Sequence, residues 1–437
     1  MQSFNKADLP GKVYLSGADC FHLVLDMHAK KHGAGGNVMR KIFQFEHTVP
    51  AGKIKTILDS SPVIYWLCNI RLMRGIFFSI PYWKFTDMGR KIILQEHHAA
   101  TEDIPRAITQ RDISVNAERF IEADIVYYPS GSCAFILSWN HILLDAKGTT
   151  LLFEHLNHLT DNRQQHFENF FPVRKKKTAF IEYIRNMYKV KAFVQSSSRP
   201  PVSSVATKNA KGAGEISRYK LIHFSAEESG KIQENAFKTG SRFGPTLYFI
   251  ACCSHVIHAI NTRRNNAGDL WLPVPYDGRL KGAVGPLISN CVSILFYRIP
   301  EHELGTVKQT VKCLNEQMMS QVKDKIPQRY NMFLDMMRHF PLWLYYFLVS
   351  STSAGVFASF LYTSTGDNFN ELTSLFGEPL TDITMMPALT FPPGLTFVFL
   401  KHENQLSLNI AYSADIISDN ELHLIEQKIK EILLADY

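Results

Sequence analysis

An apolar segment that ends abruptly in polar residues is the feature that most constrains this chain. Cys133 to Trp139 reads Cys-Ala-Phe-Ile-Leu-Ser-Trp and has the length and composition of a buried strand. Asn140 and His141 follow at once, and Asp145 stands four residues after the histidine. Histidine is the natural proton acceptor near neutral pH. The pattern predicts a general base at His141, with Asp145 either orienting its ring or fixing the turn that carries it. The alternative is a buried pair that is hydrogen-bonded for structural reasons only, which is also common.

This segment resembles the His-His-x-x-x-Asp-Gly motif of the CoA-dependent acyltransferase superfamily. That group includes chloramphenicol acetyltransferase, the condensation domains of peptide synthetases, and the wax ester synthase/diacylglycerol acyltransferase family. In these families the second histidine is the base and the aspartate, mainly structural, usually pairs with an arginine; His141 and Asp145 match them. The chain departs from the motif twice. Asn140 replaces the first histidine, and the glycine is displaced from Ala146 to Gly148, which can change the loop that shapes the channel.

The bulk composition is that of a large globular protein. The chain has 437 residues, 46% hydrophobic and 20% charged, so two domains of roughly 200 residues are expected. The net charge of +7 suits a phosphorylated thioester donor, an acidic carrier protein or an anionic membrane surface, and is too small and dispersed to indicate nucleic acid. Seven cysteines without a C-x-x-C pattern predict reduced thiols in a cytoplasmic protein, and the N-terminus has no apolar signal core.

A segment rich in Ser, Pro, Gly, Ala and Lys marks the expected domain boundary. Residues 196–216 read as a crossover linker between an N-terminal subdomain (1–195), which carries the His motif, and a C-terminal subdomain (217–437). The resemblance implies an α/β (α+β) fold of two chloramphenicol-acetyltransferase-like subdomains. Each would be a mixed sheet flanked by helices, with a tunnel between them and His141 at its centre. No internal repeat is visible, so this symmetry comes from the resemblance alone.

Local patterns place elements on both sides of the motif. Phe120–Tyr128 and Cys133–Trp139 are expected to be the strands of a hairpin that leads into His141. Thr149–Leu159 has a helical apolar stripe, and the N-terminal dipole of that helix could hold part of the loop or an anion. The segment Leu15–Met27 resembles the "Leu-Ser-x-x-Asp" start of the wax ester synthase family.

Three clusters are given their simpler interpretation. The glycine run Gly33–Gly36 leads into a strand pattern rather than a helix, so it predicts a flexible turn rather than a phosphate cradle. Gln95–His98 lacks the spacing of metal ligands and is expected to be a solvated loop. His155 and His158 have no third ligand nearby in the sequence and are interpreted as structural or surface histidines.

A block in the second half resembles the superfamily's "strand, Arg, then Gly-x-x-x-x-Asn, strand" segment. The expected strand Leu270–Pro275 is followed by Arg279, Gly285 and Asn290, and a second strand begins next. We predict that Arg279 is the partner of Asp145 or shapes the site beside it. The alternative is that Arg279 is an ordinary surface arginine.

The strand expected at Phe357–Thr363 ends in Thr363–Gly366, which resembles the family's "Ser-Asn-x-Gly" although the asparagine is absent. Ser364 or Thr365 could therefore hydrogen-bond the reacting oxygen. The terminal part of the chain predicts a hairpin and an amphipathic helix from Asp419 to Leu434.

Two stretches bear on membrane contact. Residues 340–366 carry no formal charge and are long enough for a span, but Pro341, Gly355 and several hydroxyl residues favour a buried or interfacial helix. Phe180–Phe193 predicts a basic amphipathic helix that can rest on an anionic membrane or meet a carrier protein, or is simply solvated. Peripheral membrane contact of a cytoplasmic protein therefore stays open.

Together these features predict an acyltransferase of lipid metabolism that moves an acyl group from a CoA or acyl-carrier-protein thioester to a lipid alcohol or amine. The aromatic and methionine content favours a long-chain substrate. His141 is the expected base and Asp145 its orienting partner; the substrate-binding positions are Asn140, Gly148, Arg279, Asn290 and Ser364. A backbone amide near the loop with Ser364 or Asn290 would stabilise the oxyanion. No metal or other cofactor and no covalent acyl-enzyme are expected. The alternatives are an amide-forming condensation enzyme acting on carrier-bound substrates, and a silent member that binds a lipid or a partner.

Overall fold

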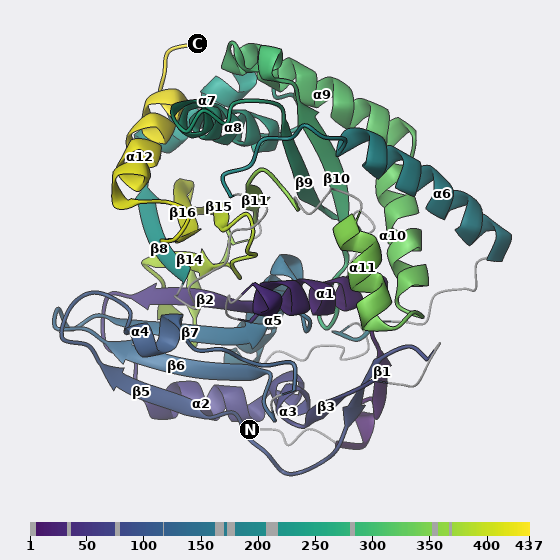
Figure 1. Cartoon of the computed structure of the whole chain (residues 1–437). Helices are drawn as coiled ribbons and strands as arrows, with labels where there is room; N and C mark the ends of the chain where they lie inside the picture. Colours follow the sequence, from purple (N-terminus) through teal and green to yellow (C-terminus); the bar gives the residue numbers. More distant parts are fainter. Residues whose placement is uncertain are drawn as a thin grey trace.

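The computed structural model describes residues 6–32, 36–74, 79–116, 118–161, 170–172, 180–206, 217–279, 285–351, 357–366 and 369–437. Within them the chain forms two mixed α/β halves, each with its own sheet and flanking helices (Figure 1). The predicted fold class is therefore confirmed. Most of the glycine run at 33–36 lies outside the described residues.

The first half is built on a five-stranded mixed sheet in the order β14-β2-β7-β6-β5. All eight residues of β7 are buried, as expected for an apolar strand at the centre of a sheet. Its neighbours β2 and β6 pair with it antiparallel, whereas β5 runs parallel to β6. Helix α5 packs on the sheet through Phe153, whose ring lies 4.2 Å from that of Phe43. The elements are β2 (Val38–Phe45), β5 (Leu94–His98), β6 (Ile121–Tyr127), β7 (Cys133–Asn140), β14 (Asp382–Met386), α2 (Ala51–Ser60), α3 (Pro62–Cys68) and α5 (Ala146–Thr160).

The second half is built on a four-stranded sheet in the order β11-β15-β16-β8 and an adjacent antiparallel pair, β9 and β10. Helices α7, α8, α9 and α12 lie on the outer side of these strands (Figure 1). The ring of Phe249 in α8 stacks on that of Phe399 in β15, with the ring centroids 4.2 Å apart. Helix α7 begins with a capping box formed by Ser225 and Glu228. The elements are β8 (Ser217–His223), β9 (Leu270–Asp277), β10 (Val292–Ile299), β11 (Leu361–Ser364), β15 (Leu395–His402), β16 (Gln405–Ser413), α7 (Ala226–Lys238), α8 (Thr246–Arg263), α9 (Val307–Lys323) and α12 (Asp419–Leu433).

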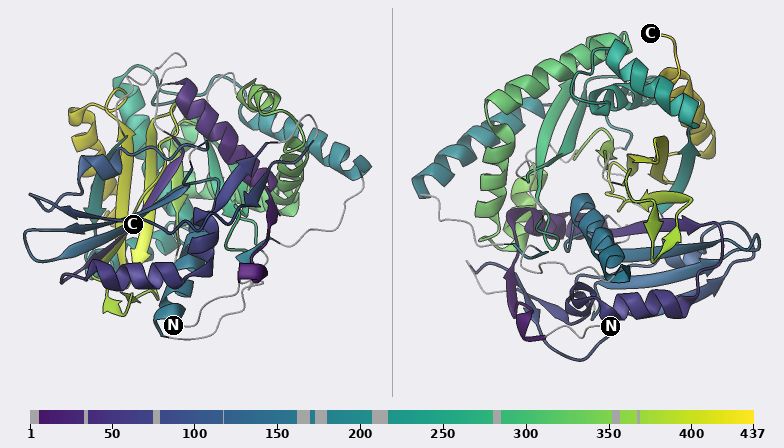
Figure 2. Two further views of the ribbon diagram at one scale, coloured as in Figure 1. Left: turned by 90° about the horizontal axis from the view of Figure 1, so that it is seen from below. Right: turned by 180° about the vertical axis from the view of Figure 1, so that it is seen from behind.

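The two halves exchange elements rather than meeting at a simple linker. Strand β14 comes from the C-terminal part of the chain and pairs antiparallel with β2 in the first sheet (Figure 1). Helix α6 (Phe180–Ser197) lies along α10 (Ile326–Met337) of the second half (Figures 1 and 2). Residues 198–206 of the expected linker are docked on that half, with Ser203 N donating to Asp269 O (2.8 Å) and Val205 N to Ser359 O (3.1 Å). Residues 207–216 lie outside the described range.

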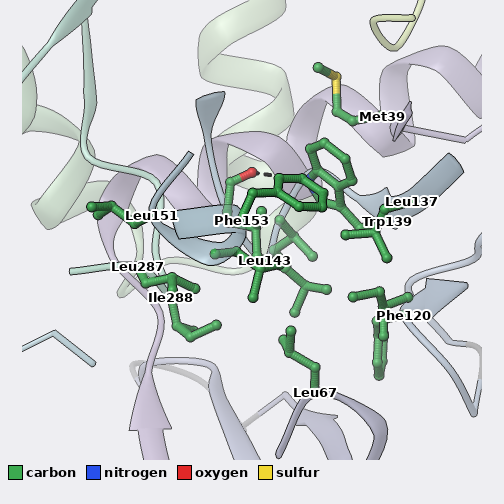
Figure 3. Packing of buried hydrophobic residues seen from close by; sticks show 14 of the residues in the cluster. Met39, Leu67, Phe120, Leu137, Trp139, Leu143, Leu151, Phe153, Leu287 and Ile288 are labelled. Atoms are coloured by element: carbon green, nitrogen blue, oxygen red, sulfur yellow. Dashed lines mark hydrogen bonds between the residues drawn. The ribbon is translucent and has the colours of Figure 1, made fainter. Parts of the chain in front are cut away.

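One hydrophobic core spans both halves next to the His141 loop. Figure 3 shows Leu143 of this loop near Trp139 of β7 and close to Leu287 and Ile288, which come from the second half. The Trp139 indole donates a hydrogen bond to Leu144 O (3.2 Å), which closes the loop onto its own strand. The loop is thus held between two parts of the chain that are far apart in sequence.

Some local expectations are wrong or need adjustment. Gln95–His98 is not a loop but part of the edge strand β5, where His97 pairs with Asp124 (2.8 Å). Helix α5 begins at Ala146, three residues before the expected start. The uncharged stretch 340–366 contains the helix α11 (Leu342–Ser351) and the strand β11. In the described parts of the chain, every helix is too short or too polar to cross a bilayer.

The first half also contains α1 (Gly17–Lys31), which carries part of the site. The remaining elements are short: η1 (Lys6–Asp8), β1 (Lys12–Tyr14), β3 (Ile70–Met73), β4 (Tyr82–Phe85), α4 (Arg106–Thr109), η3 (Glu301–Leu304), β12 (Ser374–Leu375) and β13 (Glu378–Pro379).

Candidate active site

The loop that carries His141 is shaped by the residue before it. Asn140 ends β7 and is wholly buried, and its amide nitrogen donates to Ile113 O (2.8 Å) while its amide oxygen accepts from Ile142 N (3.2 Å). His141 N donates to Asn37 O (2.8 Å), at the entrance to β2. Asn140 was predicted to bind substrate. In the structure both ends of the amide are used by backbone groups, so Asn140 fixes the turn that presents His141, and substrate binding by Asn140 stays a prediction.

Asp145 joins the loop to the second half of the chain. It is the N-cap of α5, and its Oδ1 accepts from Gly148 N (2.8 Å). Arg279 donates to both carboxylate oxygens at 2.9 Å, and Cys291 N donates to Oδ2 at 2.8 Å. The side chains of Arg279 and Asp145 are 4% and 3% exposed. The predicted partnership is therefore confirmed as a buried, two-pronged ion pair across the halves.

Gly148 lies where the backbone of the second half comes very close to α5. A Cβ built on Gly148 would lie 2.5 Å from Leu287 O and 3.1 Å from the Leu144 Cβ. The displaced glycine thus accommodates the segment that carries Leu287, and the earlier motif position is occupied by Ala146, the first residue of α5. Substrate binding at Gly148 stays a prediction.

Replacing Gly148 with alanine is expected to lower the free energy of unfolding by about 1–3 kcal/mol, because the added methyl group meets a backbone carbonyl that cannot move alone. Denaturant unfolding followed by circular dichroism measures the change. Gly230→Ala is the matched control, because Gly230 also lies in a helix but a Cβ there meets nothing within 4 Å. That variant should gain about 0.5–1 kcal/mol. Equal signs for the two variants would contradict the close approach at Gly148.

Asn290 holds the backbone of the His141 loop from the other side. Its amide nitrogen donates to His141 O (2.9 Å), Ile142 O (3.2 Å) and Asp19 Oδ1 (2.9 Å). The prediction that this residue belongs to the site is consistent with these contacts, but the amide donors are used by protein groups. Asn290 therefore positions the loop in this structure.

Asp19 is a site residue that the sequence reasoning did not assign. It completes the capping box of α1 with Ser16 and accepts from Asn290 N (2.6 Å) and from the Ser289 hydroxyl (3.2 Å). Burial raises the pKa of Asp19 to about 6, although these hydrogen bonds act in the opposite direction. Asp19 thus anchors the segment of Ser289 and Asn290 to α1.

His22, on the same face of α1, is a second residue that was missed. Its imidazole stacks on that of His141, with ring centroids 3.9 Å apart and planes inclined by 25°. The Asn37 amide nitrogen lies 3.1 Å from His22 Nδ1 and 3.3 Å from His22 O. The signal in the sequence was the spacing of Asp19, His22 and Asp26, which puts three polar side chains on one face of the helix.

The surroundings of His141 keep its imidazole neutral. Burial lowers its pKa from the ordinary value of 6.5, and the Asp145 charge and the nearby carbonyl groups of His141 and Leu144 only partly oppose this shift. The ring nevertheless keeps partial exposure, whereas Nδ1 is buried and has no hydrogen-bond partner among the described residues. A neutral, partly exposed imidazole can accept a proton at neutral pH.

Comparisons with known proteins support the fold and no closer relationship. No family model matches the chain, and no curated protein matches it. Among solved structures, the first condensation domain of the CDA synthetase matches with a TM-score of 0.68 and 14% identity over 98% of this chain and 96% of that one. A trichothecene 15-O-acetyltransferase from Fusarium sporotrichioides matches with 0.69 and 12% identity over 99% of both chains. The starter condensation domain of rhizomide synthetase, in complex with C8-CoA and Leu-SNAC, matches with 0.65 and 10% identity over 97% and 94%. The chain has the fold of the condensation domains and CoA-dependent acyltransferases.

Within this condensation-domain fold, two hydroxyl residues expected near the reacting oxygen differ in their surroundings. Ser364 ends β11, and its hydroxyl accepts from Gly366 N (3.2 Å) in its own turn. The Thr365 hydroxyl is buried and has no hydrogen-bond partner among the described residues. A role for either side chain in binding the reacting oxygen stays a prediction.

Other candidate ligands are used structurally. His155 is buried on α5, with its Nε2 3.0 Å from the Ser61 hydroxyl and its ring against Phe170. In the described ranges, no three His, Cys, Asp or Glu side chains are grouped so that they could hold a metal ion.

Proposed function

We propose that this protein is an acyltransferase that uses His141 as its general base. The observation that carries the proposal is the neutral, partly exposed His141 ring on a loop fixed by the Asp145–Arg279 pair and by Asn290. A base must be neutral before it acts and must be held in place; the lowered pKa of His141 supports the first requirement and the fixed backbone of its loop supports the second.

The reaction begins with an acyl thioester and an acceptor that carries a hydroxyl or amine. His141 removes the acceptor proton as the acceptor oxygen or nitrogen forms a bond to the thioester carbonyl carbon. The tetrahedral intermediate then collapses, the carbon–sulfur bond breaks, and the imidazolium returns the proton to the leaving thiolate. The products are an ester or amide and a free thiol, and the mechanism needs no covalent acyl-enzyme and no redox step.

We propose CoA or an acyl carrier protein as the donor and a lipid alcohol or amine as the acceptor. The net charge of +7 favours an anionic donor. A structural neighbour was solved with C8-CoA and Leu-SNAC, so the same fold in that protein accommodates a CoA thioester and a small thioester together. The high aromatic content, 12% of residues, favours a long acyl chain.

Acceptor-dependent release of free thiol tests the proposal. The donors are acetyl-, octanoyl- and palmitoyl-CoA and an octanoyl carrier protein, and the acceptors are hexadecanol and hexadecylamine. Release that requires both a donor and an acceptor, with the ester or amide identified by mass spectrometry, is the expected result. The absence of thiol release with every combination would overturn the enzyme proposal and favour a protein that binds a lipid or a partner without turnover.

A condensation enzyme that forms amides between carrier-bound substrates is the second candidate. Several of the structural neighbours are condensation domains, which is the observation that favours it. Activity with the octanoyl carrier protein and none with octanoyl-CoA would support this candidate.

The pH dependence follows from the lowered pKa of His141. A base loses activity once it is protonated, and an ordinary histidine would be half protonated at pH 6.5. We therefore expect kcat/KM to fall as the pH is lowered, with its half-maximal value at a pH below 6.5. A pH–rate profile measured under subsaturating donor checks this, and a half-maximal rate at or above pH 6.5 would contradict the environment described for His141.

A further inference from the structure

The position of the ring proton on neutral His22 follows from the contact of this ring with Asn37. The Asn37 side-chain nitrogen contacts both His22 Nδ1 and the carbonyl oxygen of His22. A carbonyl oxygen only accepts hydrogen bonds, so the Asn37 group that faces it must be the amide NH₂ rather than the amide oxygen. That NH₂ only donates, and His22 Nδ1 must accept. The ring proton of neutral His22 is therefore on Nε2.

The direction of the His22 proton follows from the same contact. The two nitrogens of an imidazole lie at well-separated edges of the ring, so a ring whose Nδ1 faces Asn37 turns its Nε2 away from Asn37. His141 is held to Asn37 through its backbone N–H (2.8 Å), and its Nε2 is the ring nitrogen farther from the backbone. Because the two rings stack with centroids 3.9 Å apart, the donor His22 Nε2–H lies close to the His141 ring.

A hydrogen-bond donor close to His141 can stabilise the oxyanion that forms during acyl transfer. The thioester carbonyl oxygen becomes an oxyanion during acyl transfer and requires a preorganised hydrogen-bond donor. The amide of Asn290 is used by Asp19 and by the loop carbonyl groups. His22 is partly exposed, and the hydrogen-bond contact of its ring among the described residues is that of Nδ1 with Asn37.

We propose that His22 is a second catalytic residue, whose Nε2–H donates a hydrogen bond to the thioester carbonyl oxygen while His141 deprotonates the acceptor. This inference rests on the proposed acyl transfer. His22 keeps its proton throughout, so the proton balance of the reaction is carried by His141 alone. Burial, followed by the proximity of His141, holds the pKa of His22 well below its usual value, so the ring stays neutral during the cycle.

Three variants test the role of His22. Each is assayed with the donor and acceptor that give the highest wild-type turnover. His22→Phe keeps a stacked ring and removes the donor, and is expected to lower kcat by about 10²–10³-fold with little change in the KM for the donor. His22→Gln supplies a side-chain N–H at a similar reach and should recover at least about tenfold of that loss. Thr365→Val removes the rival hydroxyl donor and should keep more turnover than His22→Phe.

Several outcomes would overturn the proposal. Full turnover of His22→Phe, or equal losses in His22→Phe and His22→Gln, would limit His22 to packing against His141. A large loss in Thr365→Val alone would assign the oxyanion to Thr365. An active wild-type enzyme with an unaffected His22→Phe variant refutes only this inference, whereas a wild-type protein that releases no thiol refutes acyl transfer and this inference together.

Nuclear magnetic resonance of histidine-labelled protein gives a readout that needs no turnover. The expected spectrum shows His22 with a proton on Nε2 and a bare Nδ1 at neutral pH. Asn37→Asp replaces the amide donor with an acceptor and should move the proton toward Nδ1. A wild-type His22 that carries its proton on Nδ1 would refute the donor role directly.

Discussion

Replacing His141 with alanine should lower acceptor-dependent thiol release by about 10²–10⁴-fold, the range that a positioned general base contributes. The remaining contacts of the loop are made by Asn140, Asp145 and backbone groups, so the fold should persist. The loss should appear in kcat and in kcat/KM together, because the proton transfer occurs only in the transition state. Steady-state kinetics with the best donor and acceptor, together with a circular dichroism spectrum, measures both effects.

His47→Ala is the matched control for this substitution. The His47 side chain is 87% exposed, so its removal deletes an imidazole without touching the loop. The control should keep wild-type turnover. If His141→Ala also kept wild-type turnover, another group would be the base and the proposed mechanism would be wrong.

Replacing Arg279 with alanine should destabilise the fold by about 3–5 kcal/mol, because it leaves the buried Asp145 carboxylate without its counter-charge. Asp145 also caps α5, so the loop between His141 and α5 should loosen and turnover should fall as well. Arg279→Lys should rescue little, because an ammonium group cannot reproduce the two parallel hydrogen bonds. Chemical denaturation and thiol release measure the two effects.

A surface ion pair provides the comparison for Arg279. Arg218 lies 3.6 Å from Asp419, and both side chains are well exposed, so Arg218→Ala should change stability by no more than about 0.5 kcal/mol. A double-mutant cycle with Asp145→Ala isolates the coupling between Arg279 and Asp145. An Arg279→Ala variant as stable and active as Arg218→Ala would mean that the pair is dispensable, as an ordinary surface arginine would be.

The sequence predicted most of the elements around the site because their signals are local. The apolar run of β7 and the stripe of α5 each specify their element within about 15 residues. The Asp145–Arg279 pair was also predicted, although its partners are 134 residues apart. That prediction came from the resemblance, since charge and spacing cannot select one arginine among many.

Other features that depend on pairing between distant segments were not predicted. Strand β5 was predicted to be a loop because Gln95, Glu96 and His97 are polar. These polar residues can form a strand here because β5 lies at the edge of the sheet and pairs on one side only, with β6. The hydrogen bonds of the Asn140 amide with Ile113 and Ile142 were not predicted, since nothing in the local sequence indicates them. His22 was overlooked because its significance lies in a ring that stacks on it from another element.

The placement of β14 has a consequence for how the protein is made. During synthesis β2 emerges hundreds of residues before β14, its neighbour at one edge of the first sheet. The backbone N–H and C=O groups along that edge of β2 stay unpaired until β14 has been synthesised. Unpaired strand edges of this kind can pair with a wrong partner. The first sheet is therefore complete only after β14 has been made, and the loop that bears His141 acquires its supports from Arg279 and Asn290 only once that part of the second half has been synthesised.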